Sequence, residues 1–334
     1  MAHSLDRLQQ RTPWLSFPVA VWKKFGDDQG GSLAALIGFY AFTALFPLLL
    51  VLVTVLDIVL RNYPALRSQV LDTAYGQVPL IGDQLRHLSG LHETGLALVF
   101  GLLLTFLGAR GVAGAAQNAL NTVWAVPFNR RPGFPWNQLR GIGLILGFGI
   151  GELITSLLSG LAAGSGQPWA RAGAIAISLL LNVGLFWLAF RLATASEITA
   201  WELFPGALMS AVVWQVLQLT GTYILRHQLA HSSALYGTFG LVLGLISWLF
   251  LQAQVTMYAV EASVVHARKL WPRSLVPPPL TSSDRRADKL YTTAAQRRPD
   301  EEVKASAAAG GRPAAGLSGR PAEAEVSDQP AKGA

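Results

Sequence analysis

The sequence contains no cysteine and few charged residues, and both absences limit what the protein can be. Without cysteine there are no disulfides, thiolate metal ligands, cysteine nucleophiles or palmitoylated thiols. Charged residues make up 13% of the 334 positions and hydrophobic residues 51%, whereas a soluble domain carries about 25% charged residues. Together with a mean hydropathy of +0.39, this composition disfavours a soluble enzyme and predicts a protein embedded in lipid.

The sequence also lacks the common catalytic motifs. It has no G-x-x-x-x-G-K-S/T phosphate loop, no G-x-S-x-G nucleophile elbow and no H-E-x-x-H zinc helix. His227 and His231 have the spacing of two metal ligands on one helical face, but no third ligand lies nearby in the sequence. We therefore expect no enzymatic activity, no cofactor and no metal site.

The positive net charge has two possible interpretations. A net charge of +7 suits a nucleic-acid-binding protein, but it also suits a membrane protein with Lys and Arg beside its cytoplasmic span ends. The hydropathy favours the second reading. We expect membrane lipids and not nucleic acid as partners, and the sequence leaves the oligomeric state open.

Six stretches are apolar enough to cross a bilayer, which takes about 20 helical residues. They predict an all-α membrane protein with six transmembrane helices in a domain of residues 33–270. The second stretch is the weakest, because it spans only if its Gly- and Ala-rich continuation through Ala119 stays helical; otherwise the chain has five spans and a re-entrant segment. The expected spans are 33–60, 95–109, 139–163, 172–193, 203–225 and 235–265.

The segments outside the spans suggest short amphipathic interfacial helices. The N-terminal segment 1–32 shows no cleavable signal peptide, so the first span should remain as an anchor. Within it, residues 18–25 suit a helix lying in the cytoplasmic interface, with an ordinary soluble helix start as the alternative. Two more short helices, 66–75 and 81–91, should cap the outer mouth. Residues 271–334 read as a disordered cytoplasmic tail, because they are rich in Pro, Ala and Gly and poor in aromatic residues.

The orientation follows from Lys and Arg near the span ends. Twelve fall on the side of the two termini, including Arg110 in the second connection, and five fall on the other side. Both termini should therefore be cytoplasmic.

Several spans carry polar residues at helical spacing. Glu152 lies near the middle of the third span, where a carboxyl group is expensive unless it is protonated, paired or facing water. Such stripes can line a hydrated path or can simply join helices by hydrogen bonds, and both readings stay open. The candidate path consists of Glu152, Thr155, Ser156, Ser159, Ser178, Asn182, Gln215, Gln218 and Thr222.

Two other features of the spans call for interpretation. Gly143, Gly147 and Gly151 recur every four residues, and we expect this stripe to serve helix packing. Asp57 and Glu261 lie near span ends, so either could reach water by a small tilt.

Three blocks of sequence resemble the YihY/BrkB family of bacterial inner-membrane proteins. The resemblance covers roughly residues 17–270 and has two visible departures. Ala44 stands where the family often has Ser, and the Gly-rich tail is not a family feature. The blocks are a stretch leading to Leu45-Phe46-Pro47, the segment from Asn118 through Asn121 to Trp124, and Tyr236-Gly237 followed by Trp248 and Glu261.

This resemblance implies six spans, a place in the inner membrane and a link to envelope integrity and virulence. It also implies a role in moving or sensing a lipid or other amphiphile of the envelope, along the polar path. The alternative is a scaffold whose polar stripes only fix helix packing. A ribonuclease label once attached to the family finds no support here, because phosphodiester cleavage needs clustered acid and base groups or metal ligands.

Overall fold

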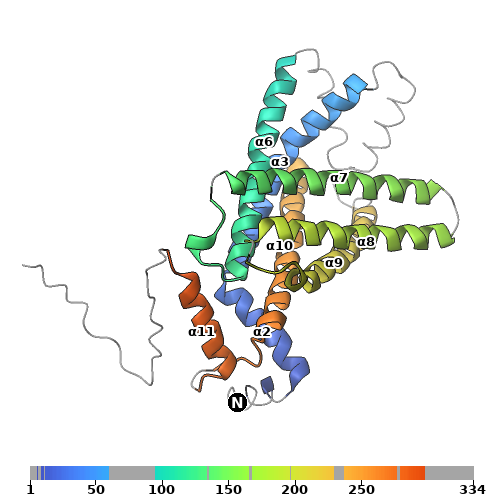
Figure 1. Cartoon of the computed structure of the whole chain (residues 1–334). Coiled ribbons are helices and arrows are strands. Elements are labelled where there is room, and N and C mark those ends of the chain that lie inside the picture. The colour runs from blue at the N-terminus through green and yellow to red at the C-terminus, as the bar shows by residue number, and fades with distance from the viewer. Residues whose placement is uncertain are drawn as a thin grey trace, which may run out of the picture. The chain divides into compact units, whose positions relative to one another are not determined.

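The computed structural model describes residues 6, 9–10, 12–59, 95–133, 135–164, 168–195, 197–228, 237–276 and 279–297. All of them belong to one compact unit, Met1–Val303. Every regular element in these residues is a helix, which confirms the all-α class (Figure 1). The helices are α2 (Pro13–Asp27), α3 (Gly30–Val59), α6 (Gly95–Val123), a short 3-10 turn (Phe128–Arg130), α7 (Trp136–Gly164), α8 (Pro168–Ala193), α9 (Ala200–Gln228), α10 (Gly237–Arg268) and α11 (Ser282–Ala294).

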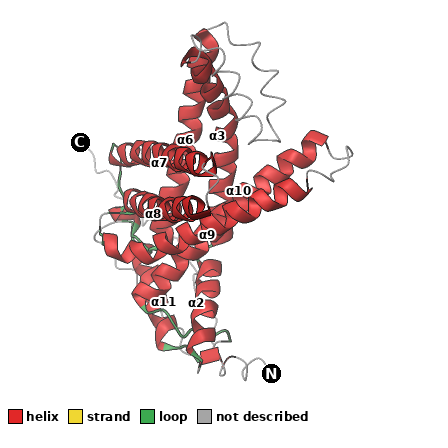
Figure 2. Ribbon diagram, turned by 90° about the vertical axis from the view of Figure 1, so that its right-hand side faces the viewer, coloured by secondary structure: helices red, strands yellow, loops and turns green. Residues whose placement is uncertain are grey.

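Consecutive long helices pack in pairs. Helix α3 packs along α6, α7 along α8, and α9 along α10 (Figure 2). Helix α10 also contacts α3 and α2, and α8 contacts α9, so the pairs are joined mainly through α8, α9 and α10. The apolar side chains left exposed on the long helices, such as Phe100, Leu103 and Leu180, are those expected to face lipid.

Five helices in the described part of the chain are long and apolar enough to cross a membrane, so the expected number of six is not confirmed. Helix α7 has 29 residues, but it is not among the five. The five spans are Gly30–Leu48, Val99–Val123, Ala172–Ala193, Ala200–Gln218 and Val242–Arg268.

The Gly- and Ala-rich continuation of the second span is helical, and α6 runs unbroken to Val123. Close packing against α3 explains this, because a Cβ atom on Gly108 would lie only 2.8 Å from the Cα atom of Ala44. Arg110 therefore lies inside the helix and not in a connection, as the sequence had suggested. Without Arg110, the Lys and Arg count becomes eleven against five.

The apolar core lies where one end of each long helix meets. Phe186 and Phe190 of α8 pack there beside Val123 and Trp124, which close α6, and Leu203 near the start of α9. Alanines such as Ala34, Ala207 and Ala253 are buried in the same cluster. The packing of the helix ends in this core positions the polar groups described below.

The expected interfacial helix 18–25 lies within the longer helix α2. Its apolar residues face protein and not lipid: Ala20, Val21 and Phe25 are buried, and the Phe25 ring stacks on Tyr258 at 3.9 Å. The exposed side carries Trp22. The interfacial interpretation is thus wrong for the face that contains Val21 and Phe25.

The expectation of a disordered tail from residue 271 is wrong for its first part. Helix α11 begins with a capping box, in which the Thr281 hydroxyl accepts from the Asp284 N–H and the Asp284 carboxylate accepts from the Thr281 N–H. Ala287 of α11 packs into a second apolar cluster with Val21 and Val265. Residues 298–334 lie outside the described residues, as do the expected helices 66–75 and 81–91.

Candidate functional site

The polar path predicted from the sequence is described only in part. Ser178 and Asn182 are buried in α8, and the Asn182 Oδ1 atom has no hydrogen-bond partner. On α9, Gln215 is half-buried and Gln218 is exposed. The side chains of Glu152, Thr155, Ser156, Ser159 and Thr222 lie outside the described residues, as does all of Tyr236. The path therefore stays a prediction.

The glycine stripe of α7 lies against a row of leucines on α8. A Cβ atom on Gly143 would lie 3.4 Å from Leu192, and one on Gly147 would lie 3.5 Å from Leu188. A Cβ atom on Gly151 would collide with Leu185. The absence of side chains on this stripe thus permits the close contact between α7 and α8.

A buried ionic cluster joins α2, α6 and α10. The Lys24 ammonium group donates to the Glu261 carboxylate at 2.8 Å, to the Val123 carbonyl at 2.8 Å and to the Asp28 carboxylate. Lys24 is 2% exposed and Glu261 is fully buried, so the prediction that Glu261 reaches water by a small tilt is wrong. We refer to Lys24, Asp28 and Glu261 as the buried ionic cluster.

The cluster keeps its cation charged. Burial alone would lower the pKa of Lys24, but the nearby Glu261 and Asp28 carboxylates outweigh this effect and raise the pKa above its ordinary value. The Val123 carbonyl lies at the C-terminal end of α6, where carbonyl groups have no partner within the helix. A cation at this end also interacts favourably with the negative end of the helix dipole. Lys24 therefore caps α6 while it pairs with α10.

The Asn118–Trp124 segment has a structural role in this arrangement. The Asn121 side chain, which is 3% exposed, accepts from the Ala195 N–H at 2.9 Å and donates to the Ala193 carbonyl at 3.2 Å. Asn118 accepts from Arg131 at 3.0 Å. Asn121 thereby ties the end of α6 to the end of α8.

Phe46, Pro47 and Gly237 also belong to the resemblance, and they lie elsewhere. Pro47 is inside α3 and Phe46 beside it is exposed, whereas Gly237 begins α10. The structure brings Val123 and Glu261 together at Lys24, but it does not bring Phe46 to the same place.

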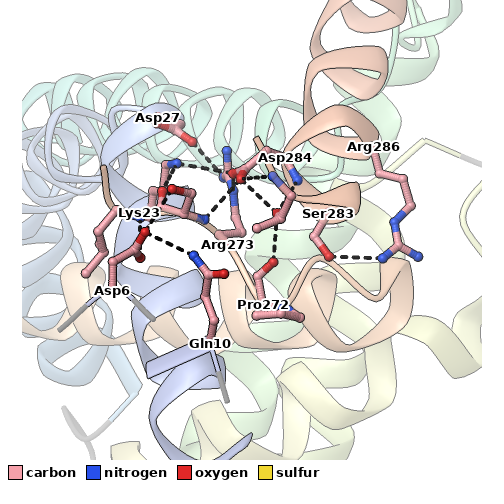
Figure 3. A network of polar contacts seen from close by, with 12 residues as sticks. Asp6, Gln10, Lys23, Asp27, Pro272, Arg273, Ser283, Asp284 and Arg286 are labelled. Carbon is pink, nitrogen blue, oxygen red and sulfur yellow. Dashed lines mark hydrogen bonds and ion pairs between the residues drawn. The ribbon is translucent and has the colours of Figure 1, made fainter. Parts of the chain in front are cut away.

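A second network connects the chain's first residues with those around α11 (Figure 3). Arg273 donates to Asp284 at 3.0 Å and to Asp27 at 2.7 Å, and Lys23 pairs with Asp284 at 3.2 Å. Asp6 accepts from the Leu275 N–H at 2.9 Å. We call this set, with Asp6, Lys23, Asp27, Arg273 and Asp284 as its charged members, the terminal network.

Hydrogen bonds decide the charge state in this network. Burial opposes ionisation of Asp284, but donors from the Ser274 N–H, Thr281 and Arg273 outweigh it and hold the pKa of Asp284 well below its ordinary value. For Arg273, burial is likewise outweighed by Asp284 and Asp27, which raise its pKa. Asp284 and Arg273 are therefore both ionised at neutral pH, and the network joins the two terminal segments.

A groove between α6 and α7 has a different character. It encloses a volume of about 190 Å³. The Gln117 side chain crosses between the two helices and donates to the Asn137 carbonyl at 3.0 Å. We call it the α6/α7 groove; it is lined by Phe106, Arg110, Ala113, Gly114, Gln117, Asn137, Gln138, Gly141, Ile142 and Ile145.

Arg110 gives this groove its positive charge. The side chain is exposed, and among the residues that the structure describes it forms no ion pair or hydrogen bond. An Arg near the centre of a membrane helix costs about 2.5–3.5 kcal/mol on insertion. Within the described residues, no group of acidic side chains and histidines is arranged to hold a metal ion.

Sequence reasoning missed both Lys24 as a buried residue and Arg110 as a groove residue. For Lys24, the four-residue spacing to Asp28 on one helix was an available signal. For Arg110, the only signal was the helicity of the Gly- and Ala-rich continuation, which depends on packing against α3.

Comparisons with known proteins relate this chain to a family of bacterial membrane proteins. Residues 21–278 match the profile of the family described as virulence factor BrkB. The inner membrane protein YhjD of Escherichia coli (strain K12) is 23% identical over 274 residues, which cover 75% of this chain and 80% of that protein. A UPF0761 membrane protein of Azotobacter vinelandii is 25% identical over 287 residues, or 79% of this chain and 66% of that protein. No solved structure matches.

Proposed function

The chain belongs to the BrkB family of multi-pass inner-membrane proteins, and from this premise we propose that it binds and moves a lipid-like component of the envelope without catalysing a reaction. The observation that supports the proposal is the α6/α7 groove. Polar and charged side chains line it together with apolar residues such as Phe106 and Ile142. That combination suits an amphiphile, whose polar and apolar parts need different surroundings.

The proposal extends to orientation and partners. We place both termini in the cytoplasm, so the buried ionic cluster and the terminal network lie on the inner side. Membrane lipids, and not nucleic acid, are the proposed partners. The polar residues around Glu152 would continue the groove along the same face of α7.

A scaffold role is the alternative, and the buried ionic cluster favours it. Lys24 and Glu261 fasten the helices at one end, as a purely structural membrane protein would require. The two functions differ in whether α6 and α7 must be free to admit an amphiphile.

A disulfide across the groove separates these functions. A Cβ atom on Gly141 would lie 3.3 Å from the Ala113 Cβ atom, close to the separation found in disulfides. Because the chain has no native cysteine, the pair Ala113→Cys and Gly141→Cys would form the only bridge. Oxidation should abolish complementation of an envelope-stress phenotype, and reduction should restore it.

The matched control is the pair Ala113→Ser and Gly141→Ser, which should complement with and without oxidant. Lipid bound to the purified protein is measured in parallel, and it should fall when the bridge forms. Full activity of the oxidised cysteine pair would support the scaffold and contradict movement through the groove.

A further inference from the structure

We propose that Arg110 binds the phosphate of a lipid headgroup within the α6/α7 groove. This inference rests on the proposed function, because it names the chemical class of the amphiphile that the groove accepts. It concerns a side chain that the buried ionic cluster and the terminal network do not involve.

The position of Arg110 along α6 is the first argument. Thirteen residues separate it from Val123, the last residue of the helix, which is about 20 Å at 1.5 Å per residue. Long side chains on a helix lean toward its N-terminus, so Arg110 leans away from the Val123 end. On the other side, fifteen residues lead to Gly95. The guanidinium group therefore lies too deep to reach water easily at either end.

The second argument is the missing counter-charge. In the described part of the chain, Asp28 and Glu261 pair with Lys24, and Asp27 and Asp284 pair with Arg273. None of these carboxylates pairs with Arg110. A cation at membrane depth without a protein anion is stabilised by an anionic ligand.

The third argument is the chemistry around Arg110. A guanidinium group offers paired N–H donors that match a phosphate. Nearby, Gln117 and Asn137 add amide groups, and the Asn137 Oδ1 atom is buried without a hydrogen-bond partner. This free acceptor suits a hydroxyl or amine of the same headgroup.

A lipid fits better than a soluble anion. The enclosed volume of about 190 Å³ suffices for a phosphate headgroup but not for acyl chains. Chains would extend along the exposed apolar surface of α6, where Leu103 and Leu107 are about half exposed. A soluble anion would gain nothing from that surface.

Photo-cross-linking tests the inference. Benzoylphenylalanine replaces Ile142, a groove residue that is 39% exposed, in protein purified in maltoside micelles, which contain no phosphate. The probes are radiolabelled phosphatidylglycerol and radiolabelled diacylglycerol with the same chains. We expect cross-linking to phosphatidylglycerol to exceed that to diacylglycerol by about tenfold, the effect of one charge-assisted hydrogen bond.

Two variants identify Arg110 as the source of this preference. Arg110→Gln should bring the ratio close to one, and Arg110→Lys should retain part of it. Arg191→Gln removes the same charge from α8, outside the groove, and should leave the ratio unchanged. The unfolding temperature of Arg110→Gln should equal or exceed that of the wild type, so loss of preference cannot be attributed to misfolding.

The outcomes separate the two proposals. Equal cross-linking of both lipids in the wild type, or a preference that survives Arg110→Gln, would overturn phosphate recognition but leave a lipid groove. Absence of cross-linking to either lipid would overturn the lipid groove as well. Excess inorganic phosphate should not compete, and complete competition would identify a site for a soluble anion and overturn the lipid assignment.

Discussion

Lys24 and Arg110 are both cations on helices, and their surroundings differ. Lys24 is buried with two carboxylates and a carbonyl around it, whereas Arg110 faces a groove and pairs with none of the described carboxylates. A buried cation with all its donors satisfied holds helices together, and removing a partner leaves an uncompensated charge. A cation without partners costs stability and stays available to a ligand.

The largest effect is expected from Lys24→Met. It leaves Asp28 and Glu261 buried without their common cation, which should lower the free energy of unfolding by about 3–5 kcal/mol. Thermal unfolding of the detergent-solubilised protein measures the loss. Arg110→Leu, which also removes one positive charge, should not lower the unfolding temperature.

A compensated variant provides the control for the Lys24 prediction. Lys24→Met combined with Asp28→Asn and Glu261→Gln removes all the charges together, and it should recover most of the lost stability. If Lys24→Met alone unfolds no earlier than the wild type, the ionic cluster does not stabilise the helix junction.

A smaller effect is expected from the terminal network, because two of its members, Lys23 and Asp27, are partly exposed to solvent. A chain that ends after Leu280 loses Asp284 and α11, and we expect it to lose about 2–3 kcal/mol of stability. A chain that ends after Val303 keeps both and should be unchanged. Equal unfolding temperatures for the two truncations would show that α11 does not contribute.

The same network predicts a dependence on acid. The folded-state pKa of Asp284 lies below the ordinary value of 3.8. The contribution of Asp284 to stability is therefore complete above pH 3.8 and is lost as pH falls through the folded-state pKa. As pH falls below the ordinary value of 3.8, the unfolding temperature of the wild type should therefore fall more steeply than that of Asp284→Asn. Parallel curves would contradict this assignment.

The smallest effect on stability is expected from single cysteines that report orientation. Cysteines introduced at Ser4, Ser89, Asn129 and Ala295 should leave stability unchanged, and only the one at Ser89 should label from outside intact cells. Ser283 is unsuitable because it is fully buried. Labelling at Asn129 from outside would show that the buried ionic cluster lies on the outer side of the membrane and would contradict the proposed orientation.

The fold class was predictable because it depends on patterns that are local in the sequence. Long apolar stretches with little charge predict membrane helices, and the described helices follow them. Helix ends were harder to predict: α6 continues to Val123 because Gly108 packs against Ala44, a contact between distant segments. The prediction of a disordered tail was wrong at α11 for the same reason, since contacts between distant segments hold Asp284 to Lys23 and Arg273.

By itself, the sequence determined that this chain is a helical membrane protein of the BrkB family, since hydropathy and motif spacing are properties of the chain alone. Only the tertiary structure decided which polar residues are partnered. Lys24 meets Glu261 across 237 positions, and no local pattern records that separation. Arg110 belongs to a groove because α7 passes beside α6. Pairing and solvation of charge depend on neighbours in space, so they are decided only when the helices pack.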